Sequence, residues 1–188
     1  MNNDVKKYKW GLLLGLCLLL FSSSAFFTNR IKTDNVISFG NIKVQLLNHT
    51  LDENGNEVEV KSDEESLRYE NVSRIIKVKN VCAHPAYIRV KLNMTGQDDA
   101  GTFPADKYVT YDFADAKWQE KDGWFYYTEI LEPDKTTEDL MRGIKFDINK
   151  LTKDHAGSSI KFKVNLQAVQ SQNNSKDVFK AQGWPEEE

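Results

Sequence analysis

Three histidines, His49, His84 and His155, are the side chains best suited to acid–base or metal chemistry, and their spacing supports neither. None belongs to an HExxH pattern, which would place two zinc ligands on one helical face. His84 precedes Pro85 in a turn-like stretch, and His155 lies in a glycine-containing loop. The sequence also lacks a G-x-S-x-G elbow and a glycine-rich phosphate loop. It therefore predicts no enzyme activity, no cofactor and no metal site, with the histidines at surface or turn positions.

The acidic stretch Asp52–Glu57 has the composition of a cation-binding loop. Calcium takes six or more oxygen ligands, and loops that bind it place carboxylates at alternate positions. This stretch supplies some of those oxygens but lacks the spacing of an EF-hand and the bidentate glutamate that closes one. Because Asn54-Gly55 is a favoured two-residue hairpin turn, we interpret the stretch as a hairpin tip.

Four consecutive aromatic residues, Trp124, Phe125, Tyr126 and Tyr127, would occupy both faces of a strand in alternation. One interpretation makes Trp124, Tyr126 and Tyr127 an exposed interaction platform for a sugar. The other makes them a strand covered on both sides, by the core and by a loop or a neighbouring subunit. We favour the second, because no polar group suited to sugar hydroxyls is obvious nearby in the sequence.

The chain begins with a segment typical of a secretory leader. Three lysines in the first nine residues precede an apolar run of twelve residues, Trp10–Phe21, and three serines and Ala25 follow. A permanent membrane span needs about 20 apolar residues, so we expect this segment to be removed rather than kept as an anchor. We expect cleavage after Ala25, with Ser23 at the −3 position and Phe26 as the new N-terminus.

Export would make the protein secreted or surface-associated, with membrane contact only through the leader before cleavage. The net charge is −3, and loss of the lysine-rich leader makes the chain more acidic. That balance argues against nucleic-acid binding and against docking on anionic lipid. Cys17 lies in the leader, so Cys82 would remain alone without an internal disulfide. Within its strand-like stretch, Cys82 is interpreted as a small buried hydrophobe rather than a reactive thiol.

Apolar and polar residues alternate along much of the remaining chain. This period of two is typical of strands with one buried and one wet face, and such strands form antiparallel sheets. Polar turns separate the runs, and Pro133 marks the clearest of them. Thr136–Asp139 could begin a short helix or another strand. The predicted strands are Val36–Leu47, Ile75–Asn80, Ala86–Met94, Tyr108–Phe113, Gly123–Thr128, Gly143–Ile148 and Ser159–Gln170.

Seven to nine short strands with turn-rich links predict an all-β fold. We expect an antiparallel two-sheet sandwich of jelly-roll type, with short helices in some loops and an N-terminal signal helix in front. The expected organisation is a signal peptide at 1–25, an N-terminal arm and first strand entry at 26–41, a sandwich domain at 42–184 and an acidic tail at 185–188.

Four stretches, taken in order, resemble the TasA/camelysin family of exported proteins of Gram-positive bacteria. They are SSSAFFTNRIKTDNVISFGNIKVQL, IIKVKNVCAHPAYIRVKL, DGWFYYTEILEPDKTTEDL and VNLQAVQSQN followed by AQGWP. Two departures stand out, because Asp134 replaces the usual turn glycine and Cys82 is unexpected. The resemblance implies a jelly-roll domain processed by a signal peptidase of the SipW type and located at the cell surface or in the biofilm matrix.

The resemblance further implies fibre formation by donor-strand exchange, with self-association or related matrix subunits as partners. Here the freed arm would carry Phe26, Phe27 and Ile31, which have no core of their own and could add to an exposed sheet edge. A secreted adhesion or glycan-binding module is the alternative, based on the aromatic strand. A camelysin-like metalloprotease is the third reading, and no metal-ligand pattern supports it.

Overall fold

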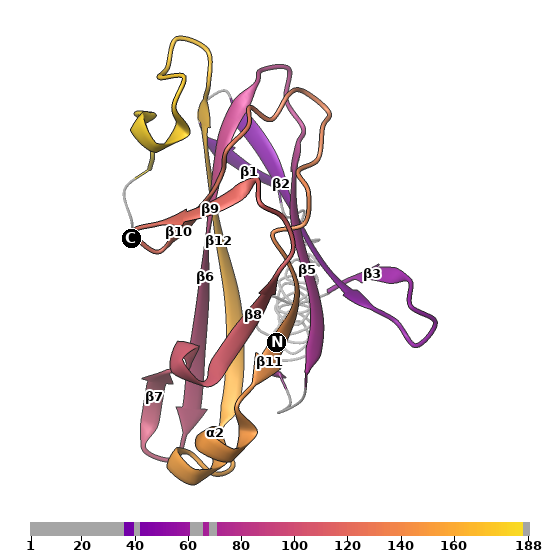
Figure 1. The fold of residues 1–188 in the computed structure, drawn as a ribbon, viewed down its shortest axis with the longest axis vertical. Helices are drawn as coiled ribbons and strands as arrows, with labels where there is room; N and C mark the ends of the chain where they lie inside the picture. Colours follow the sequence, from indigo (N-terminus) through magenta and orange to yellow (C-terminus); the bar gives the residue numbers. More distant parts are fainter. Residues whose placement is uncertain (1–35, 40–41, 61–65, 68–70, 186–188) are drawn as a thin grey trace, which may run out of the picture. The chain divides into compact units, whose positions relative to one another are not determined.

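The computed structural model describes residues 36–39, 42–60, 66–67 and 71–185, and every structural statement below concerns those residues. They form β-strands, one α-helix, α2 (Ile148–Asp154), and two single turns of 3-10 helix, η1 (Asp106–Tyr108) and η2 (Val178–Lys180). The expectation of an all-β fold is therefore confirmed (Figure 1). The predicted leader, with most of the arm, lies outside the described residues.

The strands form two antiparallel sheets. The first, sheet A, has the order β1-β2-β5-β11-β8, with β3 paired to β2; the second, sheet B, has the order β4-β12-β6-β10-β9, with β7 paired to β6. The strands of sheet A are β1 (Val36–Phe39), β2 (Ile42–Leu51), β3 (Glu57–Glu59), β5 (Val72–Asn80), β8 (Val109–Phe113) and β11 (Met141–Phe146). Those of sheet B are β4 (Ser66–Leu67), β6 (Ala86–Asp98), β7 (Gly101–Pro104), β9 (Trp118–Lys121), β10 (Trp124–Tyr127) and β12 (Ser159–Gln170).

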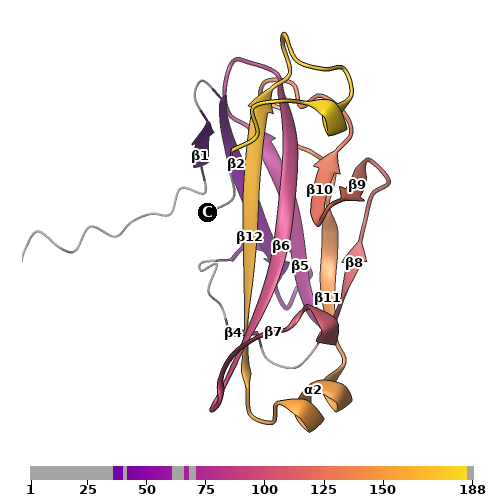
Figure 2. The same ribbon diagram turned by 90° about the vertical axis from the view of Figure 1, so that its left-hand side faces the viewer.

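The longest pairing joins β6 and β12, which lie side by side over their full overlap (Figure 2). Their register runs from Ser159 opposite Gln97 to Gln170 opposite Ala86. Even-numbered residues on both strands turn inward and most of them are buried, whereas odd-numbered residues turn outward. The predicted period of two thus decides which face of sheet B meets sheet A.

A single apolar core fills the space between the two sheets, as the burial of aliphatic side chains from both shows. Sheet A contributes Ile42, Val44, Leu46, Ile76, Val78, Met141 and Ile144. Sheet B contributes Ile88, Val90, Leu92, Met94, Ile160, Phe162, Leu166 and Ala168. The expected face-to-face packing of two sheets is confirmed.

The predicted strand Val36–Leu47 is wrong in one respect, because it comprises two strands. β1 and β2 are antiparallel neighbours with Phe39 opposite Ile42, so the chain reverses direction between them. In the sequence the dipeptide Gly40-Asn41 stands between the two strands, and Gly-Asn is a known hairpin signal. Strand pairing therefore begins at Val36, inside the range expected to hold the arm and the strand entry.

A second hairpin signal, Asp122-Gly123, marks a strand that periodicity alone does not predict. Asp122 has φ +53° and Gly123 has φ +76°, as a two-residue turn of the primed type requires. The turn joins β9 to β10, with Lys121 opposite Trp124. β4 and β7 are also absent from the predicted strands, because two and four residues are too few to show an alternation.

The hairpin predicted at Asn54-Gly55 exists, with a longer turn than expected. Asp52 N–H donates to the carbonyl of Asn56, and Gly55 N–H donates to the carbonyl of Asp52. These bonds leave a three-residue loop with Gly55 at φ +81°, where a left-handed residue is needed. The predicted strand end at Ile148 is wrong, because β11 stops at Phe146 and Asp147 caps α2 through its side chain.

Candidate functional site

The residues predicted to carry cleavage and assembly lie outside the described residues. They are Ser23 and Ala25 at the expected cleavage site and Phe26, Phe27 and Ile31 on the expected arm. The described residues include the aromatic strand β10, the three histidines, Cys82 and the acidic stretch Asp52–Glu57.

The aromatic strand is buried on both faces. Phe125 and Tyr127 face the core, whereas Trp124 and Tyr126 lie on the outer face of sheet B in a second apolar cluster. Trp124, Tyr126 and Tyr127 are only 4%, 7% and 4% exposed. Their burial agrees with the interpretation of a strand covered on both sides and counts against an exposed platform.

The outer cover is the C-terminal segment 171–185, here named the strap. Phe179 and Trp184 from the strap contact Tyr126, with ring centres 5.1 and 5.8 Å away. The Tyr87 hydroxyl donates to the carbonyl of Ser175, and the Asn174 amide donates to the carbonyl of Gln170. The strap is therefore held mainly by side chains rather than by a ladder of main-chain bonds.

Arg89 is the polar centre of this covered surface, and no sequence motif predicts its role. Its guanidinium carbon lies 4.2 Å from the ring centre of Trp124 and 4.6 Å from that of Trp184. Its Nε and Nη2 both donate to Gln167 Oε1, at 2.9 and 2.7 Å, and its Nη1 donates to the Tyr126 hydroxyl. A planar cation between two indoles is a favourable arrangement when it is removed from water. These contacts hold the strap in place and leave no open ligand site at β10.

The histidines occupy separate places. His49 Nδ1 lies 3.2 Å from Glu57 Oε2 on the β2–β3 hairpin, and His84 is exposed in the loop after β5. His155 Nδ1 lies 2.6 Å from Asp98 Oδ2, and this contact is the main reason that the pKa of Asp98 is lowered. Among the described residues, no group of three or more His, Cys, Asp or Glu side chains is arranged to hold a metal ion.

Cys82 differs from its interpretation as a buried residue inside a strand. It lies in the loop between β5 and β6 and is partly exposed, although it packs against the core. Its thiol donates to Asn80 Oδ1 and to the carbonyl of His84. These bonds connect the Cys82 side chain to two residues of the same loop.

The acidic tip Asp52–Glu57 is closed by its own hydrogen bonds. Asp52 Oδ1 accepts from the backbone N–H groups of Asn54 and Asn56, at 2.9 and 2.8 Å. The Asn56 side chain donates to the same carboxylate. This agrees with the interpretation of a hairpin tip, because the Asp52 carboxylate accepts hydrogen bonds from residues within the turn.

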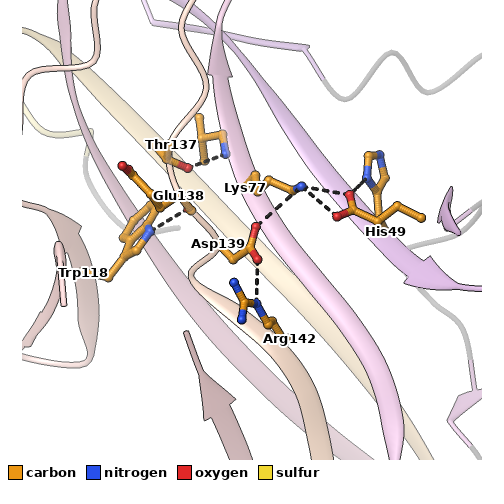
Figure 3. Close-up of polar contacts among 9 residues, drawn as sticks. His49, Lys77, Trp118, Thr137, Glu138, Asp139 and Arg142 are labelled. Carbon is orange, nitrogen blue, oxygen red and sulfur yellow. Dashed lines mark hydrogen bonds and ion pairs between the residues drawn. The ribbon is translucent and has the colours of Figure 1, made fainter. Parts of the chain in front are cut away.

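The segment 136–142 forms a polar clamp, and Figure 3 shows its main contacts. Thr137 N–H donates to the carbonyl of Val78, and Leu140 N–H donates to that of Ile76, so the segment runs along β5. Of the two readings left open by the sequence, the described residues show this strand-like pairing and no helix. Asp139 then accepts from Arg142 Nε at 2.8 Å and lies 3.5 Å from Lys77 Nζ, which also donates to Glu57.

Glu138 in the same segment binds sheet B. Its backbone carbonyl accepts from Trp118 Nε1, and its carboxylate accepts from Lys117 Nζ at 2.6 Å and from the Tyr127 hydroxyl. The bond from Lys117, supported by that from Tyr127, lowers the pKa of Glu138 to about 2. Burial, followed by the bond to Glu138, raises the pKa of Tyr127. The clamp therefore joins the two sheets and offers no group poised for acid–base catalysis.

The edge of β12 has backbone groups that could pair with another extended chain. Ser171 N–H donates to the carbonyl of Pro85, which extends the β6–β12 ladder and places odd-numbered residues of β12 toward β6. The N–H and C=O groups of even-numbered residues therefore point away from β6. On that side β4 pairs only with Ile160 and Lys161.

The edge of β12 that faces away from β6 is open at four residues, because no other described strand pairs with them on that side. They are Phe162, Val164, Leu166 and Ala168. Figure 2 shows β12 running along the margin of sheet B, with β6 on one side only. An edge of this length is a template for another extended chain.

These observations define the class of the molecule as a two-sheet antiparallel β-sandwich. Comparison with protein-family models, with curated proteins and with solved structures finds no match to the chain. Among the described residues, no helix is long and apolar enough to span a membrane.

Proposed function

We propose that the protein is an exported structural subunit of a cell surface or biofilm matrix. In this proposal a signal helix is removed from a precursor, and the freed arm of one subunit pairs with the open edge of β12 in the next. The observation that carries the proposal is that edge, where the backbone N–H and C=O groups of Phe162, Val164, Leu166 and Ala168 point away from β6. Head-to-tail pairing of this kind does not close on itself, so it produces filaments.

The proposed sandwich is of jelly-roll type. Its support is the repeated crossing of the chain between the sheets after β5: β6 lies in sheet B, β8 in sheet A, β9 and β10 in sheet B, β11 in sheet A and β12 in sheet B. Crossings of this kind are typical of double-sheet β folds.

Pairing with the edge would be favourable for two reasons. Each ladder hydrogen bond contributes about 0.5–1.5 kcal/mol net. Burial of Phe26 and Phe27 would add about 1.5–3 kcal/mol for each ring. A leader still attached to the membrane would keep the arm from its partner, so assembly would follow cleavage.

The test compares the chain that begins at Phe26 with one that lacks residues 26–35. We expect the first to form filaments in electron micrographs at high concentration and the second to stay monomeric with an unchanged far-ultraviolet circular dichroism spectrum. A matched control replaces Phe26 and Phe27 by serine, which keeps the length of the arm and removes its apolar side chains. Filaments formed by the deleted chain would show that the arm is not the donor.

A further inference from the structure

A polar hollow of about 340 Å³ lies where β7 pairs with the end of β6. Figure 1 shows β7 beside that end of β6. Small-ligand pockets have volumes of about 300–1,000 Å³, so this hollow has room for one small unit of a ligand. Four of its lining residues are exposed, which gives a ligand access from solvent: Thr95, Thr102, Pro104 and Asp106.

Polar side chains from three elements line the hollow. Asn93 and Thr95 belong to β6, Thr102 to β7 and Asp106 to η1. Within the described part of the chain, the Asn93 amide and the two threonine hydroxyls form no hydrogen bond, and Asp106 accepts through Oδ1 alone. An amide, two hydroxyls and the carboxylate oxygen Oδ2 are therefore available to a ligand.

The lining is held in place by the surrounding fold. The Met94 N–H and the Tyr111 hydroxyl donate to Asp106 Oδ1, at 3.3 and 3.2 Å, and thereby orient the carboxylate. The ring of Phe103, which also lines the hollow, stacks on His155 with ring centres 3.6 Å apart. Because these groups are ordered before a ligand arrives, binding would cost little side-chain entropy.

The donors and acceptors of the hollow suit a neutral ligand better than an ion. Asp106 supplies the one carboxylate among the described lining residues, whereas calcium takes six to eight oxygen ligands and usually several carboxylates. The same carboxylate would repel an anion. A ligand rich in hydroxyls fits, because a carboxylate accepts from O–H groups while an amide and a hydroxyl can both donate and accept.

The remaining lining is apolar and comes from Met94, Phe103 and Pro104. A sugar ring combines hydroxyls at its rim with C–H groups on its faces, so it can use an apolar wall and a polar rim together. Pockets of this composition take their specificity from a few placed polar groups and much of their contact area from apolar ones.

We propose that this hollow binds one unit of a neutral carbohydrate chain. Asp106 Oδ2 accepts a hydrogen bond from one ring hydroxyl, and the Asn93 amide and the Thr102 hydroxyl bond its neighbours. The side chains of Phe103 and Pro104 cover C–H groups of the ring. The exposed lining residues leave room for the chain to continue beyond the bound unit.

The site is separate from the edge that carries the proposed assembly. β6 lies between β7 and β12, because Thr95 is opposite Pro104 on one side and Lys161 on the other. Carbohydrate binding and filament formation can therefore be measured independently, and the failure of one leaves the other standing.

The test is saturation-transfer difference NMR of the full chain with mannotriose, maltotriose or chitotriose. The method detects signals of the sugar, so it works for a monomer and for a filament. We expect saturation transfer to at least one trisaccharide, with a Kd of about 1 mM, as a single bound unit with few contacts would give. Saturation transfer to none of the three would overturn the proposal.

Variants of the lining locate the site. The double variant Asn93→Ala with Thr102→Val should weaken binding about tenfold, because it removes two hydrogen bonds. Its matched control is Asn165→Ala with Thr110→Val, which changes the same residue types in the same exposure classes on strands outside the hollow. Equal weakening by both double variants, or no weakening by the first, would overturn the proposal.

The variant Asp106→Asn tests the carboxylate separately. It keeps an oxygen that can accept from the Met94 N–H and the Tyr111 hydroxyl, so the fold should persist with an unchanged circular dichroism spectrum. It replaces Oδ2 by an amide that cannot accept, and binding should weaken about tenfold. Unchanged affinity in the folded variant would contradict the role given to Asp106.

Three further probes test the class of ligand. The permethylated form of the trisaccharide that binds keeps the ring but has no O–H donors, and it should not bind. Equal binding of that form would reduce the site to an apolar contact and overturn the proposal. Tighter binding of the sulfated form, or displacement of the sugar by calcium chloride, would replace the neutral carbohydrate by an anion or a cation.

Discussion

The ring of Phe103 occupies the space that a β-carbon on Gly96 would need. The two residues are paired across β6 and β7, and an added β-carbon would lie less than 3.0 Å from three ring atoms. On another side the same ring stacks on His155, with ring centres 3.6 Å apart and planes within 5° of parallel. The glycine is therefore required by close packing at this end of the sandwich.

Replacing Gly96 by alanine should destabilise the fold by about 1–3 kcal/mol, because the ring must leave its stacked position. Urea unfolding monitored by circular dichroism measures the change. The variant Phe103→Ala should lose stability alone but suppress the additional effect of Gly96→Ala in a double-mutant cycle. Strictly additive effects would show that the two residues do not interact.

The turn after Pro133 offers a stabilising substitution. Asp134 has φ +60°, a left-handed conformation that costs a non-glycine residue about 1 kcal/mol. Lys135 N–H donates to the carbonyl of Glu132, which is the bond of a β-turn with Asp134 at its third position. Asp134→Gly should therefore raise the midpoint of thermal unfolding. Gly123→Ala, at φ +76° with no atom within 4 Å of the new β-carbon, should lower it by backbone strain alone.

Arg89 should be irreplaceable by lysine in holding the strap. Lysine keeps the charge but loses the planar group that lies over Trp124 and Trp184 and the two bonds to Gln167. Arg89→Lys should lower the free energy of unfolding by about 1–3 kcal/mol and make the strap more sensitive to limited proteolysis. Lys180→Gln, an exposed change within the strap, is the control, and cleavage of both variants at the same rate would contradict the assignment.

Acid should destabilise the protein in part through Glu138. Its pKa falls from 4.5 to about 2 on folding, so the unfolded state binds more protons between these pH values. Its contribution is complete above about pH 4.5 and is lost as the pH falls toward 2. Glu138→Gln should flatten the fall in stability over that window relative to wild type, as urea unfolding at several pH values would show. Glu120→Gln, on the exposed part of β9, should leave the profile as it is.

Proline substitutions at two neighbouring positions of β12 should distinguish the edge that is open from the edge that pairs with β6. Val164 N–H points away from β6, whereas Asn165 N–H points toward it. Because proline is tolerated where a strand's N–H faces outward, Val164→Pro should remain folded and stop filament growth. Asn165→Pro should instead lose the fold, because it removes a ladder bond to β6. Filaments formed by a folded Val164→Pro variant would place assembly elsewhere.

Much of the fold could be predicted, because alternation along β6 and β12 reports directly on which face is buried. The elements that were missed are those too short to alternate, such as β7, or those defined by a turn, such as β9 with Asp122-Gly123. The division of Val36–Leu47 into two strands also depends on a turn signal, because Gly40-Asn41 interrupts an otherwise continuous apolar–polar alternation in the sequence.

The candidate sites were less predictable, because they depend on contacts between distant residues. Arg89 and Gln167 are 78 positions apart, and Trp184 meets them only because the strap folds back over sheet B.

The outward-facing backbone groups of β12 belong to residues whose side chains lie in the core. Substitution of Phe162 or Leu166 by a charged residue would damage the interior before it could shield the edge. Main-chain groups are alike in every sequence, so the edge itself has little means of distinguishing one extended peptide from another. Selectivity would then depend on which chains are exported together, and when.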